Sequence, residues 1–199
     1  MADVALITSK LSVHSDFPKE GINFMDFLPI LRDPFAFETL ITHIMNHILT
    51  TTLHMTQKKK IDVVVGLDAR GFLLGPIIAL RLGAAFVPVR KAGKLPGKTI
   101  TVVYEKEYGD DSFAIQEGSV SPGDNVVVID DLIATGGSAK AAGDLIKQAG
   151  GRTLEYIFVI GLAFLKGHDK LDAPSYWVIE ADPSGSPVDK KDSNLLSAI

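Results

Sequence analysis

Residues 126–138, VVVIDDLIATGGS, contain the pattern that decides the fold. The segment opens with a short apolar run of three valines and an isoleucine, which is typical of a strand buried in a sheet. Two carboxylates, Asp130 and Asp131, come next, followed by a turn of small, hydroxyl and glycine residues. Residues 138–149 then suit a helix. A strand, a short turn and a helix in this order are typical of proteins with a parallel sheet.

The same alternation extends through most of the chain. From Pro34, apolar residues at three- and four-residue spacing predict an amphipathic helix, which ends before the lysines 58–60. Further strands are predicted at residues 61–65, 85–89 and 154–160, and a further helix at residues 71–82. We therefore predict an α/β fold with a mainly parallel central sheet flanked by helices.

Two regions interrupt this alternation. Within residues 91–123, two strand-like pieces at 99–104 and 112–116 flank a charged turn, which predicts a β-hairpin flap. Residues 182–199 are rich in proline, glycine, serine and charge and are predicted to form a loose tail. Since no repeat or low-complexity linker divides the chain, we expect residues 1–199 to form a single domain.

Composition restricts the classes of function. The chain has 199 residues, 46% hydrophobic and 22% charged, which is typical of one globular domain. Its net charge of -4 gives no general attraction to nucleic acid or to an anionic membrane. The absence of cysteine excludes disulfides and thiolate metal sites. The first residues show no signal-peptide pattern, and no stretch approaches the ~18 apolar residues of a membrane span, so we expect a cytoplasmic location.

The turn after the two acids is predicted to bind a phosphate group. This segment, here called the phosphate loop, comprises Ala134, Thr135, Gly136, Gly137 and Ser138. Its backbone amides and two hydroxyls can surround a phosphate monoester at a helix N-terminus, and its glycines permit close approach. Asp130 and Asp131 would repel phosphate alone, but they suit the hydroxyls of an attached ribose or a bridging metal ion. The pattern therefore predicts a sugar-phosphate site; the alternative is a strand–turn–helix corner with capping side chains.

Three other site patterns lack support. The sequence contains neither GxxxxGK[ST] nor GxGxxG after a strand, so nucleotide hydrolysis and Rossmann-type dinucleotide binding are not predicted. His43 and His47 lie four residues apart on the long helix, as in some zinc sites. They lack the glutamate of HExxH and a third ligand, so we do not predict a metal site there.

Five segments together resemble the adenine phosphoribosyltransferases of the type I phosphoribosyltransferase family. Besides the phosphate motif they are FPKEGINFMDFLP (17–29), GLDARGFLLGP (66–76), VRKAGKLPG (89–97) and YEKEYG (104–109). They occur in the family's order and at its spacing, and the likeness extends from residue 17 to about 174. The resemblance implies the type I phosphoribosyltransferase fold, with a small N-terminal hood within residues 1–33 and a flexible flap that closes over the reacting centre.

The resemblance also implies a reaction. Adenine and 5-phosphoribosyl 1-diphosphate would give AMP and diphosphate in purine salvage, with Mg²⁺ bound mainly through substrate oxygens. Family members act as homodimers, and we expect one here. The expected partners are therefore the two substrates, the two products and a second copy of the chain, with no nucleic acid and no membrane.

The resemblance assigns residues to each part of the substrates. The phosphate loop takes the 5′-phosphate, and Asp130 and Asp131 take the ribose hydroxyls, directly or through Mg²⁺. Phe24 stacks on adenine, whose Watson–Crick edge is read by main-chain groups of Asn23 and Met25. Glu107 matches the family's flexible loop, and our own hypothesis is that it is the catalytic residue that manages the proton at the base. The diphosphate group is assigned to Asp68, Ala69, Arg70, Arg90, Lys91, Lys94 and Tyr108.

Two residues depart from the family's pattern. Ala69 stands where the family usually has serine, so a hydroxyl contact is lost while backbone contacts are retained. Met25 stands where some relatives have arginine, which removes that side chain's own role.

Two alternative functions remain open on the sequence. Because the phosphate motif is shared across phosphoribosyltransferases, the base could be hypoxanthine, guanine or xanthine. The chain could also be a non-catalytic sensor of 5-phosphoribosyl 1-diphosphate, although it shows neither a DNA-binding module nor a basic face.

Overall fold

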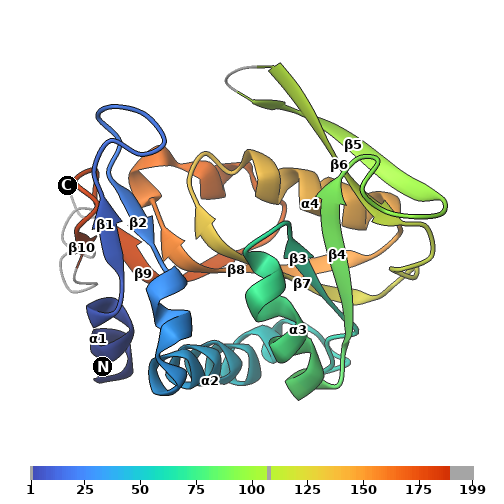
Figure 1. Cartoon of the computed structure of the whole chain (residues 1–199). Coiled ribbons are helices and arrows are strands. Elements are labelled where there is room, and N and C mark those ends of the chain that lie inside the picture. Colours follow the sequence, from blue (N-terminus) through green and yellow to red (C-terminus); the bar gives the residue numbers. More distant parts are fainter. Residues whose placement is uncertain (1, 107–108, 189–199) are drawn as a thin grey trace, which may run out of the picture.

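A sheet of eight strands forms the centre of the computed structural model, which describes residues 2–106 and 109–188 (Figure 1). In order across the sheet the strands are β10 (Pro187–Val188), β9 (Ser175–Ala181), β8 (Arg152–Gly161), β7 (Asn125–Ile133), β3 (Val63–Leu67), β4 (Ala85–Lys91), β6 (Gly109–Gln116) and β5 (Thr99–Lys106). The strands from β9 to β4 pair in parallel, whereas β10, β6 and β5 pair antiparallel at the two edges. The predicted mainly parallel α/β sheet is confirmed.

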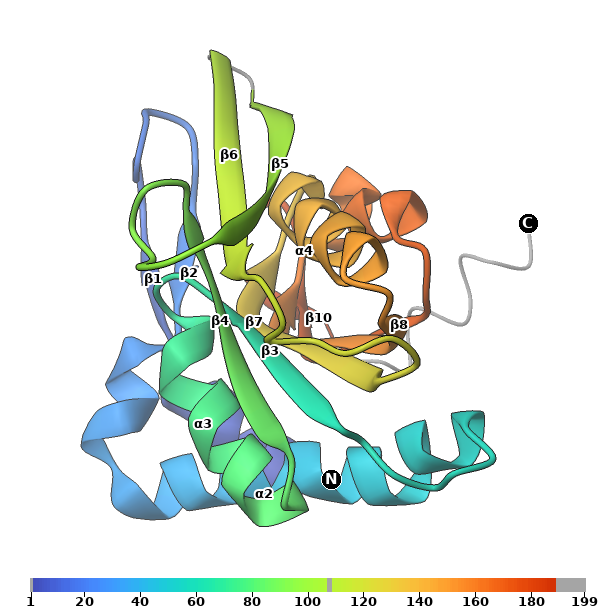
Figure 2. The same cartoon turned by 90° about the vertical axis from the view of Figure 1, so that its right-hand side faces the viewer.

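Helices cover both faces of the sheet (Figure 2). On one face lie α2 (Pro34–Thr50) and α3 (Gly71–Leu82), with α1 (Ala2–Ser9) packed beside α2, and on the other lies α4 (Gly137–Gln148). Single 3-10 turns complete the described chain: η1 (Leu28–Arg32), η2 (Thr52–Met55), η3 (Ala163–Leu165) and η4 (Gly167–Lys170). Coverage on both faces explains the continuous apolar runs of the central strands, because neither side of them meets water.

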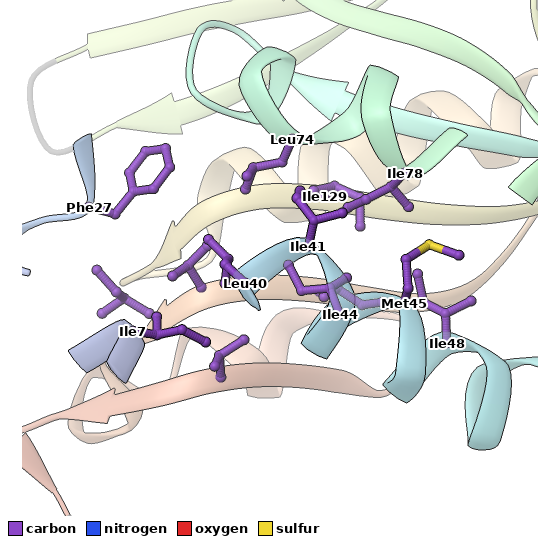
Figure 3. Close-up of a cluster of buried hydrophobic side chains, with 14 of the residues drawn as sticks. Ile7, Phe27, Leu40, Ile41, Ile44, Met45, Ile48, Leu74, Ile78 and Ile129 are labelled. Carbon is purple, nitrogen blue, oxygen red and sulfur yellow. The ribbon is translucent and has the colours of Figure 1, made fainter. Parts of the chain in front are cut away.

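Side-chain alternation along β7 divides the core into two layers. Val127 and Ile129 join the layer beneath α2 and α3, where Ile44 and its apolar neighbours are fully buried (Figure 3). Val126 and Val128 join the opposite layer, together with apolar side chains of α4 and the β5–β6 hairpin. Neighbouring residues of β7 therefore pack in different layers, one covered by α2 and α3 and the other by α4.

Local sequence explains where α2 begins. Pro34 occupies the first helical turn, where its missing N–H costs nothing. The carboxylate of Asp33 accepts hydrogen bonds from the backbone N–H groups of Phe35 and Ala36 at 3.1 and 3.2 Å, which caps the helix.

Two smaller units stand beyond the central sheet. A two-stranded sheet of β1 (Ser12–His14) and β2 (Phe24–Asp26) forms the hood on one side. The β5–β6 hairpin rises on the other, and both project from the same end of the molecule (Figures 1 and 2). The hairpin agrees with the expectation for residues 91–123. Among the described residues, no helix combines the length and the apolar character that crossing a membrane requires.

The structure also differs from the sequence-based expectation at β7, at β9 and in the tail, and the hood strands β1 and β2 were not predicted either. Strand β7 continues to Ile133 instead of ending at residue 129, because Asp130 and Leu132 still pair with β8. Strand β9 was not predicted. Residues 182–188, expected within a loose tail, instead form a turn in which Asp182 accepts from the backbone of Ser184 and Ser186, followed by β10.

Candidate active site

A cavity of about 260 Å³ opens where β3 and β7 end and α4 begins. Carboxyl ends of parallel strands are the usual ligand sites of such sheets. The walls of the cavity are Leu67, Asp68, Arg70, Phe113, Asp130, Asp131, Leu132, Ile133, Ala139 and the whole phosphate loop. The structure thus brings the predicted phosphate and ribose residues together in a single concavity, with part of the predicted diphosphate set.

The phosphate loop turns directly into α4. Gly136 is the N-cap residue and has φ +77°, a left-handed conformation that glycine adopts without strain. Its carbonyl accepts the first helical hydrogen bond, from Lys140 N–H at 2.9 Å. The first amides of a helix have no intrahelical acceptor, and together with the helix dipole they form an anion site. The cavity therefore has an electropositive end made mainly of backbone.

The two acids lie within β7 and face opposite layers of the molecule. Asp131 faces Arg70, which directly precedes α3, and Asp130, as its neighbour in the strand, leaves the backbone in the other direction. Both nevertheless line the cavity, because the strand ends there. A ligand in the cavity can thus meet carboxylates from both sides of the sheet.

Arg70 compensates one of these charges. Its Nε lies 2.9 Å from Oδ2 of Asp131, whose side chain is only 3% exposed. Burial raises the pKa of Asp131, and the Arg70 guanidinium opposes that rise. Burial, and then the charge of Asp131, raises the pKa of Asp130 well above the usual carboxyl range. Of the pair, Asp130 therefore carries the larger electrostatic cost.

The other predicted diphosphate residues lie around the entrance. Arg90 Nε pairs with Asp68 Oδ2 at 2.8 Å, and its Nη1 donates to the carbonyl of Lys94 at 3.2 Å. Lys91 Nζ lies 3.1 Å from Asp111 Oδ2 on β6. Asp68 and Arg70 reach the cavity wall, whereas Ala69, Arg90, Lys91 and Lys94 do not. The Asp68–Ala69 peptide bond is cis.

The predicted base-binding residues lie on β2 of the hood and just before it. The Phe24 ring packs edge-on against Phe17, with centroids 5.2 Å apart. The guanidinium carbon of Arg70 lies over the Phe24 ring at 5.3 Å, so one arginine contacts both Phe24 and Asp131. Met25 is 2% exposed as a whole residue and belongs to the core cluster beneath α2 and α3. Asn23 directly precedes β2.

Two predicted site residues are not described by the structure, and one residue of the cavity wall was not predicted from the sequence. The predicted catalytic Glu107 and the predicted diphosphate ligand Tyr108 lie outside the described residues. Phe113 was missed: it lines the cavity from β6 and packs against Tyr104 with centroids 4.8 Å apart. Its only sequence signal is an aromatic residue in a predicted strand, which is equally typical of an ordinary core position.

Known proteins resemble both this sequence and this structure. The family model for the phosphoribosyl transferase domain matches residues 35–186. An adenine phosphoribosyltransferase of Yarrowia lipolytica is 56% identical over 173 residues, covering 87% of this chain and 93% of its own length. A relative of the same name from Clostridium beijerinckii is 45% identical, covering 83% and 92%.

A solved structure extends the comparison to three dimensions. The adenine phosphoribosyltransferase of Saccharomyces cerevisiae, solved with adenine and an imino-altritol bisphosphate, superposes with a TM-score of 0.85 at 49% identity. The match covers 89% of this chain and 99% of the yeast chain. With fold, cavity and sequence in agreement, this chain belongs to the phosphoribosyltransferase family, within which its relatives are the adenine phosphoribosyltransferases.

Proposed function

We propose that the chain transfers the phosphoribosyl group of 5-phosphoribosyl 1-diphosphate to adenine, giving AMP and diphosphate in purine salvage. The observation that carries the proposal is one cavity that joins a backbone-lined helix N-terminus to two carboxylates and Arg70. This arrangement matches a molecule with a terminal phosphate, adjacent hydroxyls and a second anionic group. The yeast relative, solved with adenine and a bisphosphate, supports the choice of substrates.

Each part of the donor has a counterpart in the chain. The phosphate loop holds the 5′-phosphate through amides, and Asp130 and Asp131 accept hydrogen bonds from the ribose hydroxyls. Arg70 can turn from Asp131 to the diphosphate, where a cation stabilises the charge that grows as the C1′–O bond breaks. Arg90, Lys91 and Lys94 add positive charge at the entrance. Asp68 and Ala69 contribute through the turn that precedes α3.

The cavity also fits a donor that carries Mg²⁺. Mg²⁺ prefers oxygen ligands and is commonly held by one or two carboxylates together with substrate phosphates. Asp130 and Asp131 place such oxygens in the cavity wall, where a bound cation would offset their negative charge. When bound, Mg²⁺ neutralises part of the diphosphate charge. The ribose and diphosphate oxygens are its main ligands in this proposal.

Adenine binds on the hood side of the cavity. Its ring stacks on Phe24, and main-chain groups of Asn23 and Met25 read its Watson–Crick edge. Stacking requires the Arg70 guanidinium to leave the face of Phe24, since the 5.3 Å between them cannot hold another ring. The movement of Arg70 toward the diphosphate supplies that space.

The transfer itself forms the N9–C1′ bond while the C1′–O bond to diphosphate breaks. The N9 proton of adenine passes to Glu107, directly or through water, and Tyr108 contacts the diphosphate. Positioning and general-base catalysis of this kind need no covalent intermediate. Closure of the hairpin over the site excludes water, which would otherwise capture the electrophilic ribosyl carbon.

The assembly is a homodimer in the cytoplasm. In support, α3 exposes an apolar stripe in which Leu73 is 39% and Leu80 83% exposed, with Ile77 half-buried between them. Exposed apolar stripes of this kind are common at subunit interfaces.

An activity assay tests the proposal. The purified chain is incubated with 5-phosphoribosyl 1-diphosphate, Mg²⁺ and one of adenine, guanine, hypoxanthine or xanthine, and the nucleotide formed is measured. We expect AMP from adenine and little product from the other bases. Efficient use of another base would show that the chain is a phosphoribosyltransferase for that base instead of adenine. Donor binding without any product would identify a sensor.

The variant Glu107→Gln tests the catalytic assignment. Loss of a general base lowers turnover by about 10²- to 10⁴-fold, and we expect kcat to fall in that range while the thermal unfolding curve stays unchanged. Near-normal kcat would remove Glu107 from the mechanism. Glu117→Gln, in the exposed turn that follows β6, is the control and should retain activity.

A further inference from the structure

A second loop supports the phosphate loop from outside the cavity. After β8 the chain forms η3 and η4, and Gly167 begins η4. A Cβ atom added to Gly167 would lie 2.1 Å from the carbonyl oxygen of Ala134 and 2.6 Å from the amide nitrogen of Gly136. In the other direction, a Cβ atom on Gly136 would lie 2.1 Å from the carbonyl oxygen of Gly167. The two backbones are therefore in direct contact, with no room for a methyl group.

Gly136 and Gly167 require glycine for different reasons. Gly136 has φ +77°, so a side chain there would be strained whatever the space around it. Gly167 does not have a left-handed φ, and its backbone would accept alanine. Only the neighbouring phosphate loop excludes a side chain at Gly167. The contact, and not the local conformation, makes that position special.

The loop after β8 is also fixed by contacts to β7 and β9. Leu162 N–H donates to Ile133 O at 2.9 Å, which joins the start of this loop to the end of β7. The His168 ring packs on Trp177 of β9, with centroids 5.5 Å apart. Gly167 itself is buried. Since the loop is fixed on both sides, an atom added at Gly167 would displace the phosphate loop.

We infer that Gly167 is a positioning residue for the 5′-phosphate of the donor, acting through the backbone of the phosphate loop. The inference rests on the proposed function for the identity of the ligand. Phosphate binding by backbone amides depends on where the loop lies, because the amides move only with the backbone. A misplacement of about 1 Å at a substrate-positioning element can cost about 100-fold.

Gly167→Ala is the direct test. We expect the KM for 5-phosphoribosyl 1-diphosphate to rise at least ~10-fold, while the KM for adenine and the kcat at saturating donor stay within ~3-fold, as for a loss of uniform binding. Gly118→Ala is the control: a Cβ there meets nothing within 4 Å, but its φ of +76° makes alanine strained. The Gly118→Ala variant should lose stability without displacing any atom of the cavity, so its KM values should not change.

Binding of ribose 5-phosphate gives a second measurement that does not depend on catalysis. By calorimetry, the wild-type chain should bind ribose 5-phosphate and Gly167→Ala should bind it at least ~10-fold more weakly. If the wild-type chain binds ribose 5-phosphate but forms no AMP, the proposed function fails and the inference is still tested. A Gly167→Ala variant that folds and binds ribose 5-phosphate normally overturns the inference.

A milder variant covers the case in which Gly167→Ala does not fold. His168→Ala removes the packing on Trp177 and adds no atom beside the phosphate loop. We expect a rise of ~2- to 5-fold in the donor KM with an unchanged adenine KM. If the donor KM stays normal or both KM values rise equally, Gly167 and its loop have no role in positioning the phosphate.

Discussion

At the scale of single residues, Asp130 lines the cavity and carries an electrostatic cost in the free protein. It is half-buried next to Asp131, and its own Oδ1 accepts only a local hydrogen bond, from the Asp131 N–H at 2.9 Å. Arg70 pairs with Asp131 and leaves Asp130 without an equally close cation among the described residues. Charged groups that a ligand will meet often lower stability until that ligand binds.

Replacement of Asp130 by asparagine should therefore stabilise the free protein and impair its activity. The raised pKa means that the folded chain holds this proton more tightly than the unfolded chain does. The stability that Asp130 contributes is complete below the ordinary carboxyl pKa and is lost as pH rises through the raised one. Urea unfolding should thus show Asp130→Asn about 1 kcal/mol more stable than wild type at high pH.

The pH dependence separates this explanation from a simple packing effect. The advantage of Asp130→Asn should shrink to nothing toward the ordinary carboxyl pKa, and the donor KM should rise. An advantage of equal size at every pH would show that ionisation of Asp130 is not its cause. Asp144→Asn, an exposed position on α4, should show no such gain.

Single residues also show how far sequence alone can lead. The phosphate loop and the two acids are consecutive, so their proximity in the cavity was predictable. Phe113 reaches the cavity through the order of strands in the sheet, and Gly167 contacts the phosphate loop through the loop after β8. Neither residue has a local sequence pattern that distinguishes it. The burial of Met25 depends on the hood's contact with the core, which no short segment encodes.

At the scale of elements, a buried polar network joins α2 to the sheet. His47 Nε2 lies 2.9 and 3.0 Å from the two carboxylate oxygens of Glu155 on β8, and Thr52 donates to the same carboxylate. Glu155 is 3% exposed. The other histidine, His43, lies between Asp3 of α1 and the hydroxyl of Tyr176 on β9. The two histidines that superficially resemble a zinc site instead connect helices to strands.

Removal of His47 tests this network. His47→Ala leaves the buried Glu155 carboxylate with Thr52 as its only remaining partner from this group, and breaking a buried charge pair typically costs about 3 kcal/mol. In the double variant with Glu155→Gln the uncompensated charge is gone, so we expect a smaller loss than in His47→Ala alone. Urea unfolding measures both. His54→Ala, at an exposed position, should be neutral; a double variant as unstable as the sum of the singles would contradict the account.

The sequence predicted helices and strands best where short local patterns, such as turns and glycine caps, mark their ends. Helix α3 occupies residues 71–82 as predicted, between a turn and a glycine C-cap. The end of β7 was misplaced because Asp130 and Asp131 resemble loop residues, while pairing with β8 keeps them extended. Strand β9 and the hood strands were missed, since their pairing partners lie elsewhere in the chain.

At the scale of the whole molecule, the exposed face of α3 distinguishes it from an ordinary surface helix. Leu80→Asp should convert the proposed homodimer to a monomer, because it places a charge in the centre of an apolar contact. Sedimentation velocity measures the change. Phe35→Asp, at an exposed apolar position that is 72% accessible on α2, is the control and should remain dimeric. A wild-type chain that sediments as a monomer would refute the dimer itself.

The opposite orientation of the two acids in β7 restricts how the gene can vary in length. Insertion or deletion of one codon between Asn125 and Asp130 would exchange the sides on which the following carboxylates emerge, because strand residues alternate direction. Arg70 would then lose its ion pair with Asp131, and the valines of β7 would each face the opposite core layer, where they would not fit. Substitutions can accumulate in this segment one at a time. A change in its length would instead require compensating changes in both core layers, on the two faces of the sheet, at once.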